Sequence, residues 1–180
     1  IYFKMKYKKL NYLVFFIYLI SSSGSYSIER PDINNLIIHE KKKAIGKVEF
    51  FNSKKNKESL ENYKQNLIII NFWATWCAPC KEEMPHLDKL VSKNKFKEIK
   101  VIPINIADEK LEKSKEFFEE LNIKKLEIFY GSSLDLAKLF KLRGIPTTIF
   151  IDKEGYEFAR VIGFIDFENE SLLDWLSNQL

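Results

Sequence analysis

The feature that most constrains the fold is an apolar run followed closely by a Cys-x-x-Cys pair. Residues 67–73 (Leu-Ile-Ile-Ile-Asn-Phe-Trp) are almost all strand-forming, as in a parallel strand that is buried on both faces. Beyond Cys80, apolar residues recur at helical spacing with charged residues between them, at positions 84, 87, 90 and 91. The cysteine pair therefore lies at a strand-to-helix junction, with Cys77 at the N-terminus of the helix.

Cys77 and Cys80 are the two cysteines of the chain, and their spacing is compatible with three uses. A purely structural disulfide would close so short a loop that it removes little entropy from the unfolded chain. A structural zinc ion needs four ligands, and only His39 and His86 could complete such a set. Dithiol chemistry is favoured, because the amides at a helix N-terminus stabilise a thiolate. We predict that Cys77 is the low-pKa nucleophile and Cys80 the buried resolving thiol.

The first 25 residues have the three parts of a secretory signal peptide. Four lysines at positions 4, 6, 8 and 9 precede an apolar stretch at 10–20, and small residues follow at 21–25. Without those lysines, the remaining 25 Lys and Arg residues balance the 25 Asp and Glu residues, so the net charge of +4 belongs to the N-terminus. The charge therefore indicates export and gives no reason to expect a nucleic-acid partner.

Export leaves two alternatives for this N-terminal segment. Residues 1–25 are either a cleaved signal peptide or, since the apolar stretch extends weakly to Ile28, an uncleaved membrane anchor. In both cases the rest of the chain, residues 26–180, is expected to fold outside the cytoplasm. The membrane would be contacted only through the uncleaved segment.

The remaining pattern alternates strands with helices and predicts one α/β domain. Strands are expected at 47–52 and 101–106, with a short segment at 126–129 and an antiparallel hairpin formed by 147–151 and 157–162. Helices are expected at 59–64, 109–121 and 133–140, the last capped by Ser132, and the tail at 167–180 is amphipathic. The lysines at 41–43 and 54–57 are expected to be solvated loop charges, and the histidines surface or packing residues.

The residues around the cysteines resemble the thioredoxin superfamily. Residues 72–81 (FWATWCAPCK) are very close to its active-site signature, Pro85 matches its helix proline, and 145–148 match its cis-proline loop. Within the superfamily, the NFWATWC and KEEMP segments, with FIDKEG at 150–155, resemble the exported TlpA/ResA-like thiol-disulfide reductases of bacteria. The resemblance covers about residues 32 to 178.

The resemblance implies a thioredoxin fold, with a central mixed β-sheet flanked by helices, an N-terminal extension and a strand-helix insert between Cys80 and Pro146. It implies a cis peptide bond before Pro146. The backbone of Ile145 would then pair with an extended client segment, a form of strand addition. Trp76 and Pro79 would form the apolar surface around the reactive sulfur.

The resemblance also assigns a proton-transfer group. Asn71 stands where cytoplasmic thioredoxins carry a buried aspartate, and an amide does not titrate near neutral pH. Glu83, three residues after Cys80, occupies the place of the acidic residue that has this task in ResA-like proteins. We expect Glu83 to be the acid/base that serves Cys80. The alternative is a solvated glutamate on the helix surface.

These observations predict an exported thiol-disulfide oxidoreductase that acts mainly as a reductant, with no metal and no cofactor beyond the Cys77–Cys80 redox disulfide. The expected partners are client proteins with reducible disulfides, in cytochrome c or cytochrome oxidase maturation, and a membrane dithiol electron donor. A general extracytoplasmic oxidase or isomerase is the main alternative, and the reduction potential distinguishes it. A copper-binding assembly factor would need a wider cysteine pair, and for a peroxidase Thr75 is at the wrong spacing.

Overall fold

Strand β4 (Leu67–Trp73) is the centre of the fold, because every one of its residues is buried. The structure, a computed structural model, describes residues 30–180, so the expected signal peptide or anchor lies outside the described residues. β4 pairs in parallel with β5 (Ile99–Asn105) and antiparallel with β7 (Thr147–Ile151). Two long-range pairings thus cover both edges of the strand that leads to the cysteines.

The other strands extend this mixed sheet to eight in the described residues, in the order β1-β8-β7-β4-β5-β6-β2-β3. β8 (Tyr156–Ile162) forms the predicted antiparallel hairpin with β7. The strands not yet given are β1 (Leu36–Ala44), β2 (Glu49–Asn52), β3 (Lys57–Ser59) and β6 (Phe129–Tyr130). The expected mixed sheet with an N-terminal extension is therefore confirmed.

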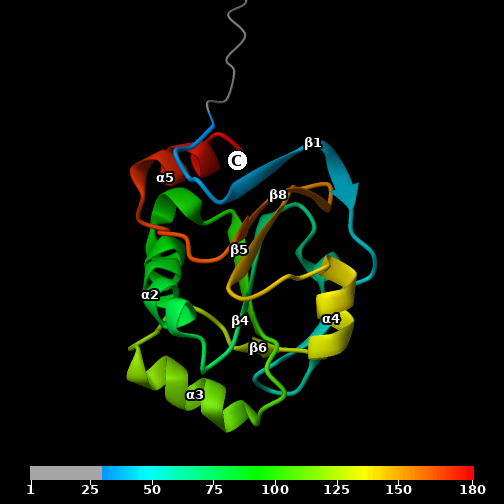
Figure 1. Cartoon of the computed structure of the whole chain (residues 1–180), viewed down its shortest axis with the longest axis vertical. Coiled ribbons are helices and arrows are strands. Elements are labelled where there is room, and N and C mark those ends of the chain that lie inside the picture. Colours follow the sequence, from blue (N-terminus) through cyan, green and yellow to red (C-terminus); the bar gives the residue numbers. More distant parts are fainter. Residues whose placement is uncertain (1–29) are drawn as a thin grey trace, which may run out of the picture.

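Helices cover both faces of the sheet (Figure 1). One face is packed by α2 (Ala78–Ser92), α3 (Leu111–Glu120) and α5 (Glu170–Ser177), and the other by α4 (Ser133–Phe140) with the 3₁₀ helix η1 (Leu60–Tyr63). A second 3₁₀ helix, η2 (Asn94–Phe96), follows α2. None of the helices in residues 30–180 is long and apolar enough to cross a membrane.

The alternation of side chains along β4 divides the core into two layers. Ile69 and Trp73 face the α2 side, and the Trp73 ring lies 4.6 Å from that of Phe117 on α3. Ile70 and Phe72 face the α4 side. Asn71 has the same parity as Ile69 and Trp73, so this polar side chain points toward α2.

Several local predictions are confirmed. α4 has the expected bounds, and the Ser132 hydroxyl caps it by accepting a hydrogen bond from the Asp135 amide at 3.3 Å. The short segment expected at 126–129 overlaps β6 only at Phe129, and the strand expected at 101–106 corresponds to β5, which begins two residues earlier and ends one residue earlier. The amphipathic tail contains α5, which buries Leu172, Trp175 and Leu176.

The expectation that the lysines at 41–43 and 54–57 lie in loops is wrong in part. Lys41, Lys42 and Lys43 belong to β1, an edge strand, and Lys57 begins β3 at the opposite edge. β1 pairs with β8, more than a hundred positions away, whereas β3 forms a local hairpin with β2. In both cases the run of exposed charges has no alternation that would predict a strand. Lysine on an edge strand also opposes pairing with other chains.

His39 on β1 takes part in a buried charge network with Glu157 and Arg160 of β8. Glu157 Oε1 accepts from His39 Nε2 and from Arg160 Nε, both at 2.6 Å, and Oε2 accepts from Arg160 Nη2 at 2.7 Å. Burial alone would raise the pKa of Glu157, but these hydrogen bonds outweigh it and hold the pKa below its ordinary value. The network therefore links β1, the first strand of the described residues, to β8.

We predict that Glu157→Ala lowers the free energy of unfolding at pH 7 by about 3 kcal/mol, because it leaves the Arg160 guanidinium buried without a carboxylate. Because the pKa of Glu157 is lower in the folded protein than in the unfolded chain, the full stabilisation is present above the unfolded-state pKa. It declines below that pKa and is lost as the pH falls through the folded-state pKa. Urea unfolding at pH 7 and pH 4 measures both effects. Glu154→Ala, at an exposed residue of the neighbouring turn, is the control and should lower the free energy of unfolding by less than about 0.5 kcal/mol. Equal losses of stability in the two variants would contradict the role of the network.

Candidate active site

The two cysteines lie where β4 gives way to α2. Cys77 is the N-cap residue, and its Sγ accepts a hydrogen bond from the Cys80 amide at 3.3 Å. The sulfurs form a disulfide, with Cα atoms 5.2 Å apart. Cys80 is fully buried, while Cys77 retains 5% exposure, so Cys77 is the sulfur closer to solvent. When the disulfide is reduced, the free amides of the first turn would stabilise a Cys77 thiolate.

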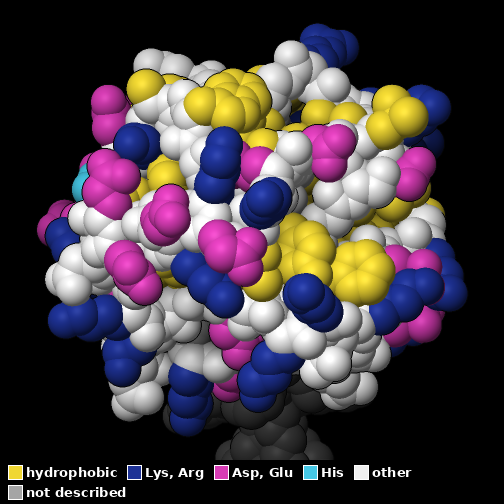
Figure 2. Space-filling model, turned by 90° about the horizontal axis from the view of Figure 1, so that it is seen from below, with side chains coloured by type: hydrophobic (Ala, Val, Ile, Leu, Met, Phe, Trp, Pro, Cys, Tyr) yellow, Lys and Arg dark blue, Asp and Glu magenta, His cyan; other side chains and the backbone are white. Residues whose placement is uncertain are grey.

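The apolar residues that were expected around Cys77 are at least partly exposed, except for Pro146. Trp76 is 72% exposed, Pro79 is exposed, and Ile145 is half-buried next to a buried Pro146. The Ile145–Pro146 peptide bond is cis, as the resemblance implied. Trp76 and Ile145 also line an apolar hollow of about 230 Å³. Figure 2 views the molecule from the end at which α3 lies and shows hydrophobic patches among scattered charges of both signs.

Glu83 is fully buried, so the alternative of a solvated surface glutamate is wrong. It lies one turn beyond Cys80 on the same side of α2. Its Oε1 accepts from Asn71 Nδ2 of β4 at 2.6 Å, and its Oε2 accepts from the Ile165 backbone amide at 3.2 Å. The carboxyl group is thus held between α2, β4 and the segment that follows β8.

Burial raises the pKa of Glu83 from an ordinary value of 4.5 to about 7, although the hydrogen bonds from Asn71 and Ile165 act to lower it. A carboxyl group with a pKa near neutrality is able to take up a proton and return it under the same conditions. The role that the resemblance gave to Glu83 remains a proposal.

A second polar network, which the sequence did not predict, holds the segment before Cys77. Thr75 Oγ1 donates to Glu109 Oε2 at 2.9 Å, and Asn105 Nδ2 donates to Glu109 Oε1 at 2.8 Å. Asn105 Nδ2 also lies 2.8 Å from Ser114 Oγ. Glu109 comes 34 positions after Thr75 in a stretch rich in charges of both signs, and nothing local distinguishes it from its neighbours.

The other ionisable residues near the cysteines are engaged elsewhere. Lys81 Nζ lies 3.2 Å from Glu120 Oε1 and 5.9 Å from the Phe117 ring centre. His86 Nδ1 lies 2.9 Å from Asp166 Oδ1, so the two histidines have different acidic partners. Within residues 30–180, no group of three or more His, Cys, Asp and Glu residues could hold a metal ion.

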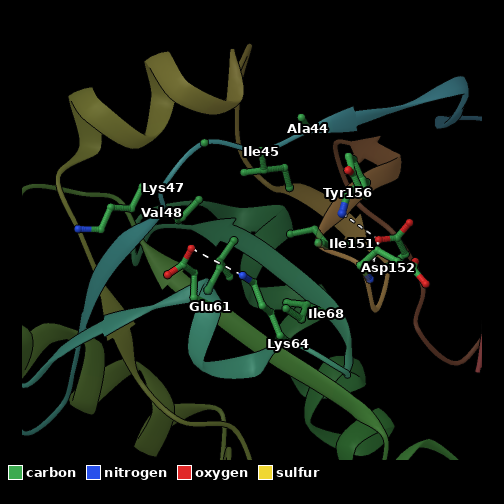
Figure 3. Close-up of a pocket in the computed structure, with 14 residues that line it drawn as sticks. Ala44, Ile45, Lys47, Val48, Glu61, Lys64, Ile68, Ile151, Asp152 and Tyr156 are labelled. Carbon is green, nitrogen blue, oxygen red and sulfur yellow. Dashed lines mark hydrogen bonds and ion pairs between the residues drawn. The ribbon is translucent and has the colours of Figure 1, made fainter.

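A second cavity, of about 340 Å³, lies at the other end of the sheet (Figure 3). Its floor includes Ile68, near the start of β4, and Ile151, at the end of β7, whereas the cysteines follow the opposite end of β4. Lys64 and Asp152 stand on its rim and are engaged with Glu61 and with the Tyr156 amide. This cavity is therefore separate from the dithiol site.

Comparison with known proteins supports the thioredoxin superfamily. Residues 41–156 match the AhpC/TSA family. The chain is 31% identical to the thiol-disulfide oxidoreductase ResA of Bacillus cereus over 107 residues, which cover 59% of this chain and 61% of the relative. It therefore spans less than two thirds of the length of that relative.

Solved structures confirm the thioredoxin fold. A DsbF homologue from Corynebacterium diphtheriae superposes with a TM-score of 0.68 at 21% identity, covering 86% of this chain and 99% of the other. The exposed lipoprotein thioredoxin of Streptococcus pneumoniae superposes with a TM-score of 0.62 at 24% identity, covering 75% of this chain and 100% of the other. The ResA-like resemblance is confirmed by the sequence relatives.

We predict that buried Glu83 makes the oxidised protein less stable as the pH rises. Between pH 4.5 and 7 the folded protein holds a proton that the unfolded chain has lost, so the free energy of unfolding falls with pH, by about 3 kcal/mol at pH 8. Glu83→Gln has no such proton, and its stability should lack this fall.

Urea unfolding of the two proteins at a series of pH values measures the difference. Glu82→Gln, at the exposed neighbouring residue, is the matched control and should follow the wild-type curve. If the wild type and Glu83→Gln change in parallel from pH 4.5 to 8, the carboxyl group does not have a raised pKa.

Proposed function

Since the chain belongs to the AhpC/TSA family, we propose that it is a thiol-disulfide oxidoreductase that reduces disulfide bonds of client proteins through Cys77 and Cys80. The observation that carries this proposal is the asymmetry of the disulfide. Cys77 caps a helix at an apolar surface, whereas Cys80 is fully buried one turn from a buried carboxyl group with a near-neutral pKa. That arrangement suits a nucleophile and a resolving thiol.

The first step is attack by the Cys77 thiolate on one sulfur of a client disulfide. The client S–S bond breaks, its second sulfur leaves as a thiolate, and a mixed disulfide joins Cys77 to the client. Trp76 and Pro79 provide the apolar contact surface. The backbone of Ile145, before the cis bond of Pro146, pairs with the extended client segment.

The second step releases the client. Cys80 gives its proton to the Glu83 carboxylate, and the resulting thiolate attacks Cys77 Sγ. The mixed disulfide breaks, the client sulfur leaves as a thiolate, and the Cys77–Cys80 disulfide forms. Two electrons have then passed from the protein dithiol to the client, and a membrane dithiol donor restores the reduced protein. No further cofactor takes part.

We further propose that this chemistry takes place outside the cytoplasm, in the bacterial periplasm. The proposal is supported by the signal-like pattern of residues 1–25 and by the balanced charge of the remainder. The similarity to an exposed lipoprotein thioredoxin is consistent with this location. Suitable clients are the haem-attachment cysteines of apocytochromes c and the copper-site cysteines of oxidase-assembly proteins.

We predict that Cys80→Ser accumulates covalent adducts with clients, because the first step proceeds and the second lacks its thiol. Non-reducing electrophoresis of cells that express this variant should show bands that disappear on treatment with thiol, and mass spectrometry of those bands identifies the clients. The serine hydroxyl is not ionised at neutral pH and does not attack the mixed disulfide.

Cys77→Ser is the matched control for this experiment. It keeps one cysteine in the same motif but removes the accessible sulfur, so it should form few adducts. Adducts that are equally abundant on Cys80, or absent from Cys80→Ser altogether, would contradict the proposed order of attack.

A further inference from the structure

The side-chain amide of Asn71 is buried and only half satisfied. Its Nδ2 donates to Glu83 Oε1 at 2.6 Å and to Thr148 Oγ1 at 3.1 Å. Its Oδ1 is buried without a hydrogen-bond partner among the described residues. Asn71 and Thr148 are directly paired across β4 and β7, and both are fully buried. An unpaired buried acceptor costs free energy unless another state of the protein uses it.

The observed orientation satisfies an ionised Glu83 but offers no acceptor from Asn71 to the O–H of a protonated one. An ionised carboxylate accepts hydrogen bonds, and Nδ2 supplies one. A protonated carboxyl group has an O–H that needs an acceptor, and an amide nitrogen cannot accept. The unpaired Oδ1 of the same side chain is such an acceptor, one half-turn of the amide away. The Thr148 hydroxyl both donates and accepts, so it can bond to either end of the amide.

We propose that the Asn71 amide rotates by a half-turn whenever Glu83 gains or loses its proton. When Glu83 is ionised, Nδ2 donates to the carboxylate and to the Thr148 hydroxyl, as in this structure. When a proton moves from Cys80 to Glu83, the new O–H donates to Oδ1, and the Thr148 hydroxyl turns to donate to Oδ1 as well. In the ionised state Oδ1 has no hydrogen-bond partner, and in the protonated state Nδ2 has none. The number of unpaired amide atoms is therefore the same in the two states.

This makes Asn71 a positioning residue that serves both forms of the acid/base. Its consequence for disulfide exchange rests on the proposed role of Glu83, whereas the rotation itself requires only that Glu83 titrates.

The neighbouring ionisable groups must be separated from Glu83 in the test. On α2 these are Cys80, one turn before Glu83, and His86, three residues after it. Asp166 and Glu168 follow β8 and lie beside His86, at 2.9 Å and 3.6 Å. β4 and β7 present only the uncharged Asn71 and Thr148. In the oxidised protein the cysteines are joined in a disulfide and do not titrate, so His86, three residues from Glu83 on α2, is the residue to control for.

Nuclear magnetic resonance of the oxidised full chain tests the rotation without any substitution. Cross-relaxation peaks from the Asn71 Nδ2 protons to the side-chain protons of Thr148 and Glu83 are expected to be strong at pH 9. They should lose most of their intensity at pH 5, with the midpoint at which the Glu83 carboxyl carbon titrates. Peaks that keep their intensity while Glu83 titrates would overturn the proposal.

Two variants assign the signal to its source. In Glu83→Gln the peaks from Asn71 should be the same at pH 5 and pH 9, because no proton is exchanged. In His86→Asn the loss at low pH should persist with an unchanged midpoint; its disappearance would transfer the effect to His86 and overturn the proposal. No client protein enters these measurements, so their failure is distinct from a failure of the proposed reductase function.

Discussion

Burial of both faces of β4 is the constraint on which the candidate site depends. β4 is covered by α2 on one face and by α4 on the other. It ends at the edge of the core, and the chain then continues into the N-terminus of α2. Cys77 is then placed where helix amides are free and solvent is close. Cys80, one turn on, is carried into the core. The difference between the two sulfurs follows from the position of the junction, with no further element required.

The same burial gives Glu83 its chemistry. A carboxyl group in the α2–β4 layer cannot be solvated, so its pKa rises toward neutrality, and the two hydrogen bonds from Asn71 and Ile165 keep it from rising further. Its presence lowers the stability of the ionised protein. Glu83 therefore destabilises the fold when it is ionised, and it lies one turn from the buried Cys80. A buried carboxyl group that costs stability is more consistent with a functional role than with a structural one.

Local sequence patterns predicted the parts of the fold whose causes are local. The apolar run of β4, the helical spacing of α2 and the Ser132 cap of α4 each depend on neighbouring residues, and all three were placed correctly. β1 was missed because its strand form depends on β8, more than a hundred positions away. The burial of Glu83 was equally invisible, since one of its partners is the backbone amide of Ile165, which leaves no signature in a sequence.

We propose that Cys77 and Cys80 differ in reactivity and that Glu83 controls the reactivity of Cys80. The most direct measurement is the alkylation rate of each cysteine in the reduced protein from pH 5 to 9, resolved by mass spectrometry, for the wild type and Glu83→Gln. Cys77 should react first and with a low apparent pKa in both proteins, whereas the pH profile of Cys80 should change in the variant. Equal rates for the two cysteines, or a Cys80 profile that Glu83→Gln leaves unchanged, would contradict the proposal.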